Sequence, residues 1–395
     1  MRFNLKLVVM RVCPLILLIE PCASLASPRQ VLVVGANQTT CHHAAFSQIQ
    51  AAIDQATPGD SIHVCGGVYP EQVSINKSLD IDADLGVFVV PPALTQNATS
   101  LATGAPIAAG IFVSGADDVS ISGLTVDMVN NSISECTPRL EGIYYQNASG
   151  SIDSVVVRNA MLAPGLNGCQ SGTGIFVESG NGGTSQVQIE RCRIYAFQKN
   201  GITANEVGTH VSIHGNTITG LGPTTGAAQN GIQVGFGATG DISFNTVVNM
   251  IWSPCTAAST CQAVATNILI FESDGVEVWF NKVAISQVGI FAHGNNETLA
   301  DNRVADSLVF DGIRLEGDEG KVDGNLVATA GEALVYVQGD ENDVIHNELS
   351  DADVGILEVA GSLKNNFKSN RFENVVVPVV DPAPMTIAEF LLPER

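Results

Sequence analysis

Three residues in neighbouring repeats of the sequence have side chains suited to proton transfer: His293 in "GIFAH", and Arg314 and Glu316 in "GIRLE". If these phrases form equivalent strands, residues one and three positions after each isoleucine point outward. Because adjacent coils would lie about 4.8 Å apart, we expect the three side-chain heads within about 8 Å of each other on one exposed face. The carboxylate of Glu316 would then tune the imidazole of His293.

Two kinds of chemistry suit this set. Paired carboxylates, with Glu272 and Asp274 at the end of the preceding strand, would serve hydrolysis of a glycan. Alternatively, Arg314 would neutralise a uronate while His293 abstracts a proton. The competing interpretation is a solvated ladder of polar side chains on an outward strand face. On the exposed-face interpretation, truncation of Arg314 or Glu316 should leave the melting temperature nearly unchanged.

The same outward rows continue toward the N-terminus with aromatic and polar residues. Flat rings with a polar margin are suited to stacking on sugar faces. The residues that we predict to bind substrate are Tyr144, Phe176, Glu178, Asn205, Gln233 and Phe291.

Two phrases recur through most of the chain and predict the elements that carry these residues. The first resembles "VSIHGNTI" and places asparagine at 159, 216, 245, 281, 302, 325, 347 and 370, with Cys192 and Leu124 in the same slot. The second begins with Gly-Ile at Gly110, Gly142, Gly174, Gly201, Gly231, Gly289, Gly312 and Gly355. A period of about 20–36 residues without helical spacing indicates a solenoid of short strands. We call the strands of the second phrase the Gly-Ile sheet.

The repeated asparagine has a structural explanation. A residue that recurs once per coil stacks on its own copies, and an amide can both donate to and accept from the next one. We therefore predict that Asn216, Asn245, Asn281, Asn302, Asn325 and Asn347 point inward in one row.

The composition favours an exported protein. Residues 1–26 have a basic start, a short apolar run and small residues before Ala26, as in a secretory signal peptide. Its removal would leave a net charge of 15 − 39 = −24. Such a charge makes nucleic acid an unsuitable partner. The apolar run is too short for a good membrane span. We expect a secreted or periplasmic monomer.

Seven cysteines remain after that cleavage, and export predicts disulfides. Cys136 and Cys169 precede consecutive Gly-Ile phrases, so they should meet on neighbouring coils. Cys255 should pair with Cys261, and Cys41 with Cys65, leaving Cys192 as a buried thiol. Cys41, His42 and His43 form an alternative metal-binding trio.

The stretch "FSQIQAAIDQATPGDSIHVCGGVYPEQVSINKSLDI", 46–81, resembles the opening of parallel β-helix proteins of the pectin-lyase-like superfamily, of the carbohydrate-binding and sugar-hydrolase, NosD-like type. The resemblance covers nearly all of the mature chain. It implies an all-β fold, a single right-handed parallel β-helix. We expect an N-terminal cap over 27–58 with a helix at 46–56, the β-helix over 59–376 and a tail or cap over 377–395. "MTIAEFLL" would lie over the last coil.

The resemblance also implies a polysaccharide or cell-surface glycan as partner, bound along one sheet between long turns. The turns that follow the first phrase are longest before Asn267, which places a walled groove over the first half of the Gly-Ile sheet. The aspartate motifs of polygalacturonases and the signatures of pectin methylesterases and mannuronan epimerases are missing. A polysaccharide lyase, a glycoside hydrolase and a non-catalytic structural or surface-interaction protein therefore remain alternatives. We expect no resident cofactor and leave a need for Ca²⁺ open.

Overall fold

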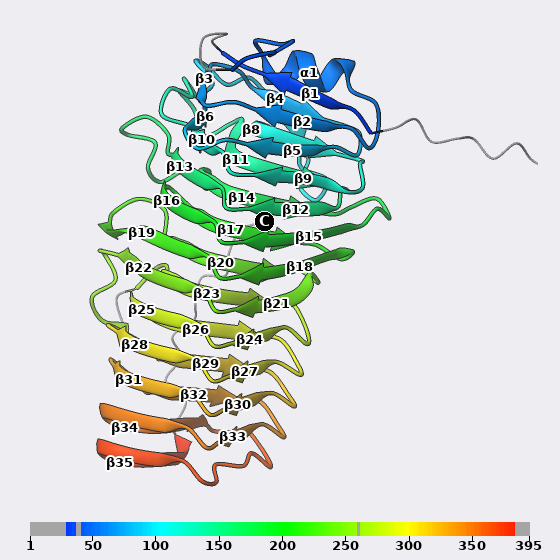
Figure 1. Ribbon diagram of the computed structural model, residues 1–395. Coiled ribbons are helices and arrows are strands. Elements are labelled where there is room, and N and C mark those ends of the chain that lie inside the picture. Colours follow the sequence, from blue (N-terminus) through cyan, green and yellow to red (C-terminus); the bar gives the residue numbers. More distant parts are fainter. Residues whose placement is uncertain (1–28, 37–40, 259–260, 384–395) are drawn as a thin grey trace, which may run out of the picture.

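The computed structural model describes residues 29–36, 41–258 and 261–383. Short strands stack coil upon coil from the N-terminal to the C-terminal end, as the colour order of Figure 1 shows. All pairings are parallel except the one between β7 (Ala98–Thr99) and β8 (Pro106–Ser114). The fold is the predicted right-handed parallel β-helix.

Each coil contributes to three columns of strands. The first column consists of β1 (Val31–Val34), β2 (Ser61–Val64), β5 (Asp80–Ala83), β9 (Val119–Ser122), β12 (Gly150–Asp153), β15 (Ser185–Glu190), β18 (Thr209–His214), β21 (Thr239–Ser243), β24 (Glu277–Trp279), β27 (Thr298–Ala300), β30 (Lys321–Asp323) and β33 (Asp343–Ile345). The second consists of β3 (Gly67–Tyr69), β6 (Val87–Val89), β10 (Thr125–Asp127), β13 (Val156–Ala160), β16 (Arg193–Phe197), β19 (Thr217–Thr224), β22 (Thr246–Trp252), β25 (Lys282–Ser286), β28 (Arg303–Ser307), β31 (Leu326–Ala330), β34 (Glu348–Val359) and β35 (Arg371–Ala383).

The third column is the Gly-Ile sheet. It consists of β4 (Val73–Ile75), β8, β11 (Arg139–Gln146), β14 (Thr173–Glu178), β17 (Asn200–Asn205), β20 (Asn230–Gly235), β23 (Thr266–Phe271), β26 (Val288–His293), β29 (Ile313–Glu316) and β32 (Val335–Gln338). At the C-terminal end, β34 and β35 are long enough to continue into this column. The strand pairing therefore extends beyond both expected limits of the β-helix, 59 and 376.

The asparagine ladder lies at the corner between the first and second columns. The amide of Asn281 receives hydrogen bonds on its oxygen from the backbone (2.9 Å) and side chain (3.0 Å) of Asn245, and it donates to Asn302 at 3.0 Å. The six predicted asparagines are at most 1% exposed, and Asn370 continues the row. The predicted ladder is confirmed, and Cys192 joins it through its backbone N–H.

The prediction that Asn159 occupies a slot of this ladder is wrong. Strand pairing places Val155 in the slot, between Leu124 and Cys192. Asn159 instead stands at the opposite end of β13, at a bend with φ +59°, where its side chain donates to Asp127. Asparagine tolerates the left-handed conformation of such bends as well as the buried slot, so residue type alone does not separate the two positions.

One short helix covers the first coil. α1 runs over Ile49–Gln55 and is shorter than the expected 46–56, because Phe46 forms a β-bridge with Val34 instead. The carboxylate of Glu71 accepts the first helical N–H groups, at 2.8 and 2.9 Å, and so satisfies donors that a helix leaves unpaired. Ile49 and Ile53 of this helix are buried. The predicted signal peptide and "MTIAEFLL" lie outside the described residues.

Three disulfides form as predicted: Cys41–Cys65, Cys136–Cys169 and Cys255–Cys261. Cys192 is the buried free thiol of the described residues. Cys41 therefore offers no thiolate, and the trio with His42 and His43 is not a metal site of the predicted kind. The bonded cysteines fit an oxidising location outside the cytoplasm.

Candidate functional site

Three rows of side chains stand on the outer face of the Gly-Ile sheet. Each Gly-Ile isoleucine points into the core, and the register continues from Ile143 to Val335. The residues one and three positions later form the two predicted rows. A third row stands just before each glycine, because the glycine itself faces the core: a Cβ on Gly142 would lie 2.5 Å from Val157 Cγ1. It contains Glu141, Thr173, Asn200, Asn230, Thr266, Val288 and Asp311.

The N-terminal end of this face is covered. Tyr144 stacks between Phe112 and Phe176, with ring centroids 5.4 and 5.1 Å apart. Its hydroxyl donates to Glu178, and both residues are at most 1% exposed. The expectation that Tyr144 and Glu178 present an open surface to a sugar is therefore wrong.

The hairpin of β7 and β8 causes this burial. Ser100 Oγ donates to Glu178 at 2.7 Å, and the backbone N–H groups of Leu101 and Ala102 donate at 2.9 and 3.2 Å. Glu178 therefore fastens the hairpin to the β-helix. Glu141 lies on the same face with Oε2 unpaired, and burial raises its pKa to about 8 although a hydrogen bond with Thr173 opposes the shift. Glu141 thus keeps its proton at neutral pH.

Amide groups occupy the middle of the face. Gln233 accepts hydrogen bonds from Asn200 and Asn230, both at 3.2 Å, and donates to Asn205 at 3.1 Å. Gln233 is 3% exposed, whereas Asn205 is partly exposed. These amides form an internally bonded network, so only its edge at Asn205 is placed to meet a ligand.

An apolar cluster follows on the next coils. It consists of Phe236, Cys255, Leu269, Phe271, Val288, Phe291 and Phe310. The turn closed by Cys255–Cys261 packs against it through Ala258 and Val264. Phe291, a predicted sugar platform, is 5% exposed. The ring of Phe271 stacks on His293, with centroids 5.2 Å apart.

The three predicted catalytic residues lie together at the end of this cluster. His293 Nδ1 is 3.1 Å from Glu316 Oε2, and Arg314 Nε donates to Glu316 Oε1 at 2.6 Å. The imidazole is 41% exposed, but the carboxylate of Glu316 is 15% exposed and Arg314 is 4% exposed. The expectation that Arg314 is an exposed cation is wrong.

Asp311 explains the burial of Arg314. Its carboxylate, which is fully buried, accepts from Arg314 Nη1 at 3.0 Å, and the guanidinium also lies 3.7 Å from the centroid of Tyr336. Burial raises the pKa of Asp311 to about 7, against the attraction of Arg314. Simple alternation missed Asp311 because Gly312 faces the core as Ile313 does, which turns the preceding residue outward: a Cβ on Gly312 would lie 2.3 Å from Val327 Cγ1. The available signal was the residue immediately before Gly-Ile.

The electrostatics of the pair suit proton exchange. The hydrogen bond to Glu316 raises the pKa of His293 above its ordinary value, against partial desolvation. Burial disfavours the carboxylate of Glu316, but hydrogen bonds from His293 and Arg314 outweigh it and lower its pKa. Nδ1 of His293 is therefore engaged, and within the described residues no partner holds Nε2.

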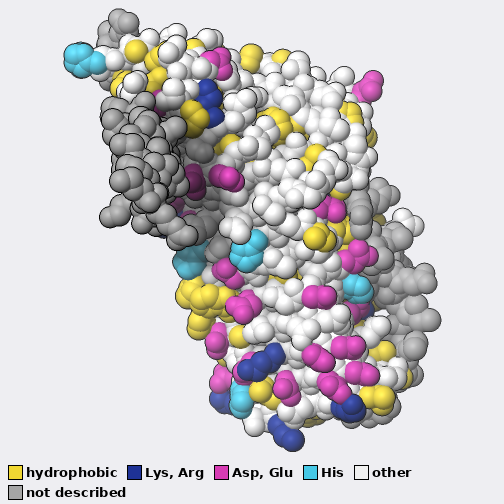
Figure 2. Space-filling model, turned by 90° about the vertical axis from the view of Figure 1, so that its right-hand side faces the viewer, with side chains coloured by type: hydrophobic (Ala, Val, Ile, Leu, Met, Phe, Trp, Pro, Cys, Tyr) yellow, Lys and Arg dark blue, Asp and Glu magenta, His cyan; other side chains and the backbone are white. Residues whose placement is uncertain are grey.

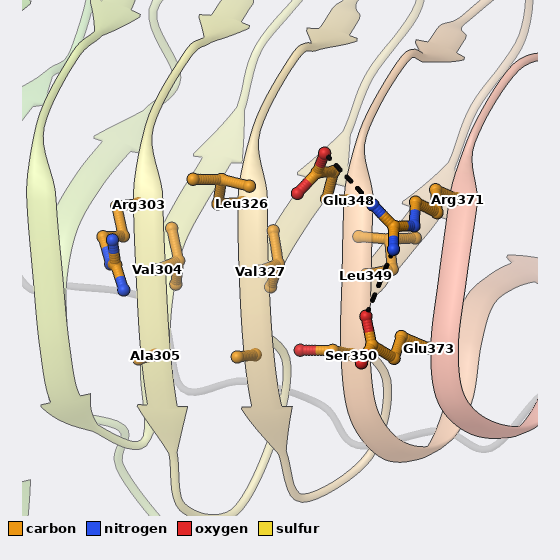
Figure 3. Close-up of a pocket in the computed structure, with 11 residues that line it drawn as sticks. Arg303, Val304, Ala305, Leu326, Val327, Glu348, Leu349, Ser350, Arg371 and Glu373 are labelled. Carbon is orange, nitrogen blue, oxygen red and sulfur yellow. Dashed lines mark ion pairs between the residues drawn. The ribbon is translucent and has the colours of Figure 1, made fainter.

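Figure 3 shows a different concavity, on the second column. Its volume is about 320 Å³, and it is lined by residues of β28, β31, β34 and β35. Arg371 lies 3.9 Å from Glu348 and 3.6 Å from Glu373, so both acidic groups of this concavity are paired. It contains no histidine or aromatic residue, and it is less suited to glycan chemistry than the face at His293.

Comparison with known proteins supports the fold. The model of the NosD family, described as periplasmic copper-binding protein, matches residues 243–381. No curated protein matches this sequence. Among solved structures, a GH136 lacto-N-biosidase from Eubacterium ramulus is similar with a TM-score of 0.61 at 10% identity, over 87% of this chain and 68% of that one. The Dettilon tailspike protein has a TM-score of 0.55 at 15% identity, over 83% and 64%. This chain thus spans about two thirds of each, and these identities show the fold alone.

The residues that match the NosD model do not fit a copper site. Soft thiolate or thioether ligands and imidazoles would be needed. Within 243–381, Cys255 and Cys261 are bonded to each other and Met250 is buried in the core. The histidines are His293 and His346, and His346 is at the other corner, 2.9 Å from Asp323. We assign no chemistry to a copper ion here.

In the described part of the chain, one group could gather around a cation: His63, Cys65 and Asp84. Cys65 is in a disulfide, so this group lacks a thiolate. The described residues also include no helix with the length and apolarity needed to cross a membrane. Fold, strand register and the family-model match together lead to one classification. The chain is a right-handed parallel β-helix protein, and its residues 243–381 are similar to the NosD family.

Proposed function

We propose that this protein binds an extracellular polysaccharide on the outer face of the Gly-Ile sheet and hydrolyses it with His293 as the proton-transfer residue. One observation carries the proposal. The imidazole of His293 is 41% exposed, and its Nδ1 lies 3.1 Å from the largely buried carboxylate of Glu316. Such a contact orients the ring and leaves Nε2 for a substrate.

The neighbours of His293 have distinct roles in this proposal. Glu316 orients the imidazole and raises its pKa, which keeps a larger fraction protonated near neutral pH. Arg314 and Asp311 are positioning residues that do not face the solvent: Arg314 holds Glu316, and Asp311 holds Arg314. Phe271 supplies a ring against which His293 is packed.

In the proposed reaction, the imidazolium gives its Nε2 proton to the leaving glycosidic oxygen as the C–O bond breaks. Water adds to the sugar carbon, and a carboxylate accepts the proton that this water releases. We assign that role to Glu272, which follows Phe271 and whose charge contributes to the raised pKa of His293.

The charge distribution favours a neutral glycan over a polyuronate. Arg314, the cation that would neutralise a uronate, is buried between Asp311 and Glu316. The remaining groups near His293 are acidic, and the chain has a net charge of −22. An anionic polymer would therefore be repelled. Hydrolysis of a neutral glycan is therefore better supported than elimination from a uronate.

Non-catalytic binding is the second candidate. It is favoured by the burial of four of the six predicted substrate-binding residues: Tyr144, Glu178, Gln233 and Phe291. A surface-interaction protein would use the face at His293 without any turnover.

The test is a degradation screen of the mature protein on xylan, β-glucan, galactan, alginate and polygalacturonate. We expect new reducing ends from a neutral polymer, and their loss in His293→Ala. His346→Ala is the matched control, since His346 is an exposed histidine that also contacts an acidic residue. Binding without turnover, unchanged in His293→Ala, would support the non-catalytic candidate. Unsaturated products from alginate or polygalacturonate would overturn the neutral-glycan proposal.

A further inference from the structure

A strained aromatic pair lies on the opposite side of the coil, at the asparagine corner. The residue before each ladder slot adopts a positive φ. In successive coils it is Gly123, Ser154, Arg191, Gly215, Phe244, Phe280, Asp301, Gly324, His346 and Ser369. Small or polar residues take this conformation in eight coils, but phenylalanine takes it in two neighbouring ones, with φ +55° and +54°. A bulky residue in the left-handed region is an outlier that costs free energy.

Burial of the two rings does not offset this strain. Phe244 is 49% exposed and Phe280 is 45% exposed, so neither ring gains the stabilisation of full burial. The two rings stack with centroids 5.1 Å apart, and Trp279 meets both edge-on at 5.3 and 5.5 Å. His214 lies against the other side of Phe244 at 5.1 Å.

The stack has one open end. Because Phe244 and Phe280 are equivalent residues of consecutive coils, their stacking direction follows the axis of the β-helix. One face of Phe280 therefore contacts Phe244, and the other faces the next coil, where the corner residue is Asp301. The side chain of Asp301 points toward Gly324, the corner residue of the following coil. Its Oδ1 lies 2.8 Å from the position that a Cβ on Gly324 would occupy. Phe280 is 45% exposed, and no aromatic ring of the described residues stacks on it from the side of the next coil, whose corner residue is Asp301.

We propose that this corner is a second carbohydrate-binding site, in which a pyranose ring stacks on the far face of Phe280 and donates a hydroxyl hydrogen bond to Asp301. A flat apolar ring next to a carboxylate acceptor matches the chemistry of a sugar, which has an apolar C–H face and hydroxyl donors at its edge. Phe244 and Trp279 hold Phe280 in place. The site does not rest on the function proposed for His293, because it lies at a different corner of the coil.

Binding of a sugar at this corner can be measured directly. Saturation-transfer NMR would measure contact of the protein with cellohexaose, chitohexaose and xylohexaose. We expect transfer to the sugar ring protons of at least one hexaose. Phe280→Gly should weaken this binding at least tenfold, and Phe244→Gly less. Ile285→Gly is the matched control, since Ile285 is also a left-handed apolar residue, 40% exposed, on the same coil. His293→Ala should leave this binding unchanged, which separates the two sites.

Melting temperatures distinguish a binding role from a structural one. Glycine occupies the equivalent position at Gly215 and Gly324, so Phe280→Gly relieves backbone strain and should keep or raise the melting temperature. A fall of several degrees, with hexaose binding retained, would show that the rings only stabilise the fold. Absence of transfer to all three hexaoses would also overturn the proposal.

Discussion

The two ends of the outer face of the Gly-Ile sheet have the same register but different accessibility. Glu178 and Glu316 stand in the same row, three positions after a Gly-Ile isoleucine. Glu178 accepts three hydrogen bonds from the β7–β8 hairpin and is 1% exposed. Glu316 accepts from His293 and Arg314, and the imidazole of His293 reaches solvent.

This difference teaches that strand register decides where a side chain points, whereas the neighbouring turns decide whether a ligand can reach it. At the N-terminal end, the polar groups of the row are used to attach a hairpin. At the C-terminal end, the buried charges Arg314 and Asp311 support an exposed histidine. Equivalent positions therefore serve architecture in one region and are available for chemistry in the other.

Removal of Arg314 should have the largest effect. Arg314→Ala leaves Asp311 buried without its partner, and we expect a loss of about 3–5 kcal/mol in the free energy of unfolding. Chemical denaturation at pH 7 measures this, with the exposed Arg303→Ala as control. The pKa of Asp311, already raised to about 7, should rise further in the variant, so its deficit should shrink as pH falls and the carboxyl takes up a proton. A melting temperature equal to that of the wild type would contradict the buried-pair interpretation.

Glu178→Gln should loosen the hairpin without affecting the site at His293. Charge-assisted hydrogen bonds from Ser100, Leu101 and Ala102 are weakened, which should cost about 1.5–3 kcal/mol. Hydrogen exchange should accelerate in the amides of 98–107. Glu277→Gln, on the exposed face of the first column, is the control. Unchanged protection of the hairpin would show that other contacts hold it closed.

A break in the asparagine ladder should lower the free energy of unfolding by a similar or smaller amount. Asn281→Ala leaves the backbone N–H of Asn245 and the carbonyl groups around Asn281 unpaired, so we expect a loss of about 1–3 kcal/mol in urea titrations. Asn130→Ala, in an exposed turn, should change stability little. Equal effects of the two substitutions would argue against the ladder as a stabilising feature.

The smallest effect concerns pH. NMR titration should give His293 a pKa above its ordinary value, and Glu316→Gln should lower it. Since the folded pKa exceeds the unfolded value of about 6.5, the contact stabilises fully below that pH and loses its contribution as pH rises through the folded pKa. For this partly exposed imidazole we expect below about 1 kcal/mol. His346 serves as the control, and a pKa of His293 that does not respond to Glu316→Gln would remove Glu316 from its proposed role.

Local features of the sequence were enough to predict the solenoid, the Gly-Ile register, the asparagine ladder from Asn216 to Asn347 and all three disulfides. The solenoid, the register, the ladder and the Cys136–Cys169 pair depend on spacings that repeat once per coil, so stacking turns sequence period directly into contact. Asn159 marks the limit of this reasoning, because asparagine suits both a buried slot and a left-handed bend, and only strand pairing assigns it to the bend.

Accessibility and the charged pair were decided by the tertiary structure alone. Burial of Tyr144 and Glu178 comes from a hairpin that precedes Glu178 by 76 to 78 residues, which no strand pattern reveals. Burial of Arg314 depends on Asp311, which points outward because Gly312 interrupts the alternation by facing the core. The sequence by itself determined which residues share a face, because that follows from the repeat. Which of them meet solvent was decided by the hairpin and by core-facing glycines, which interrupt the repeat.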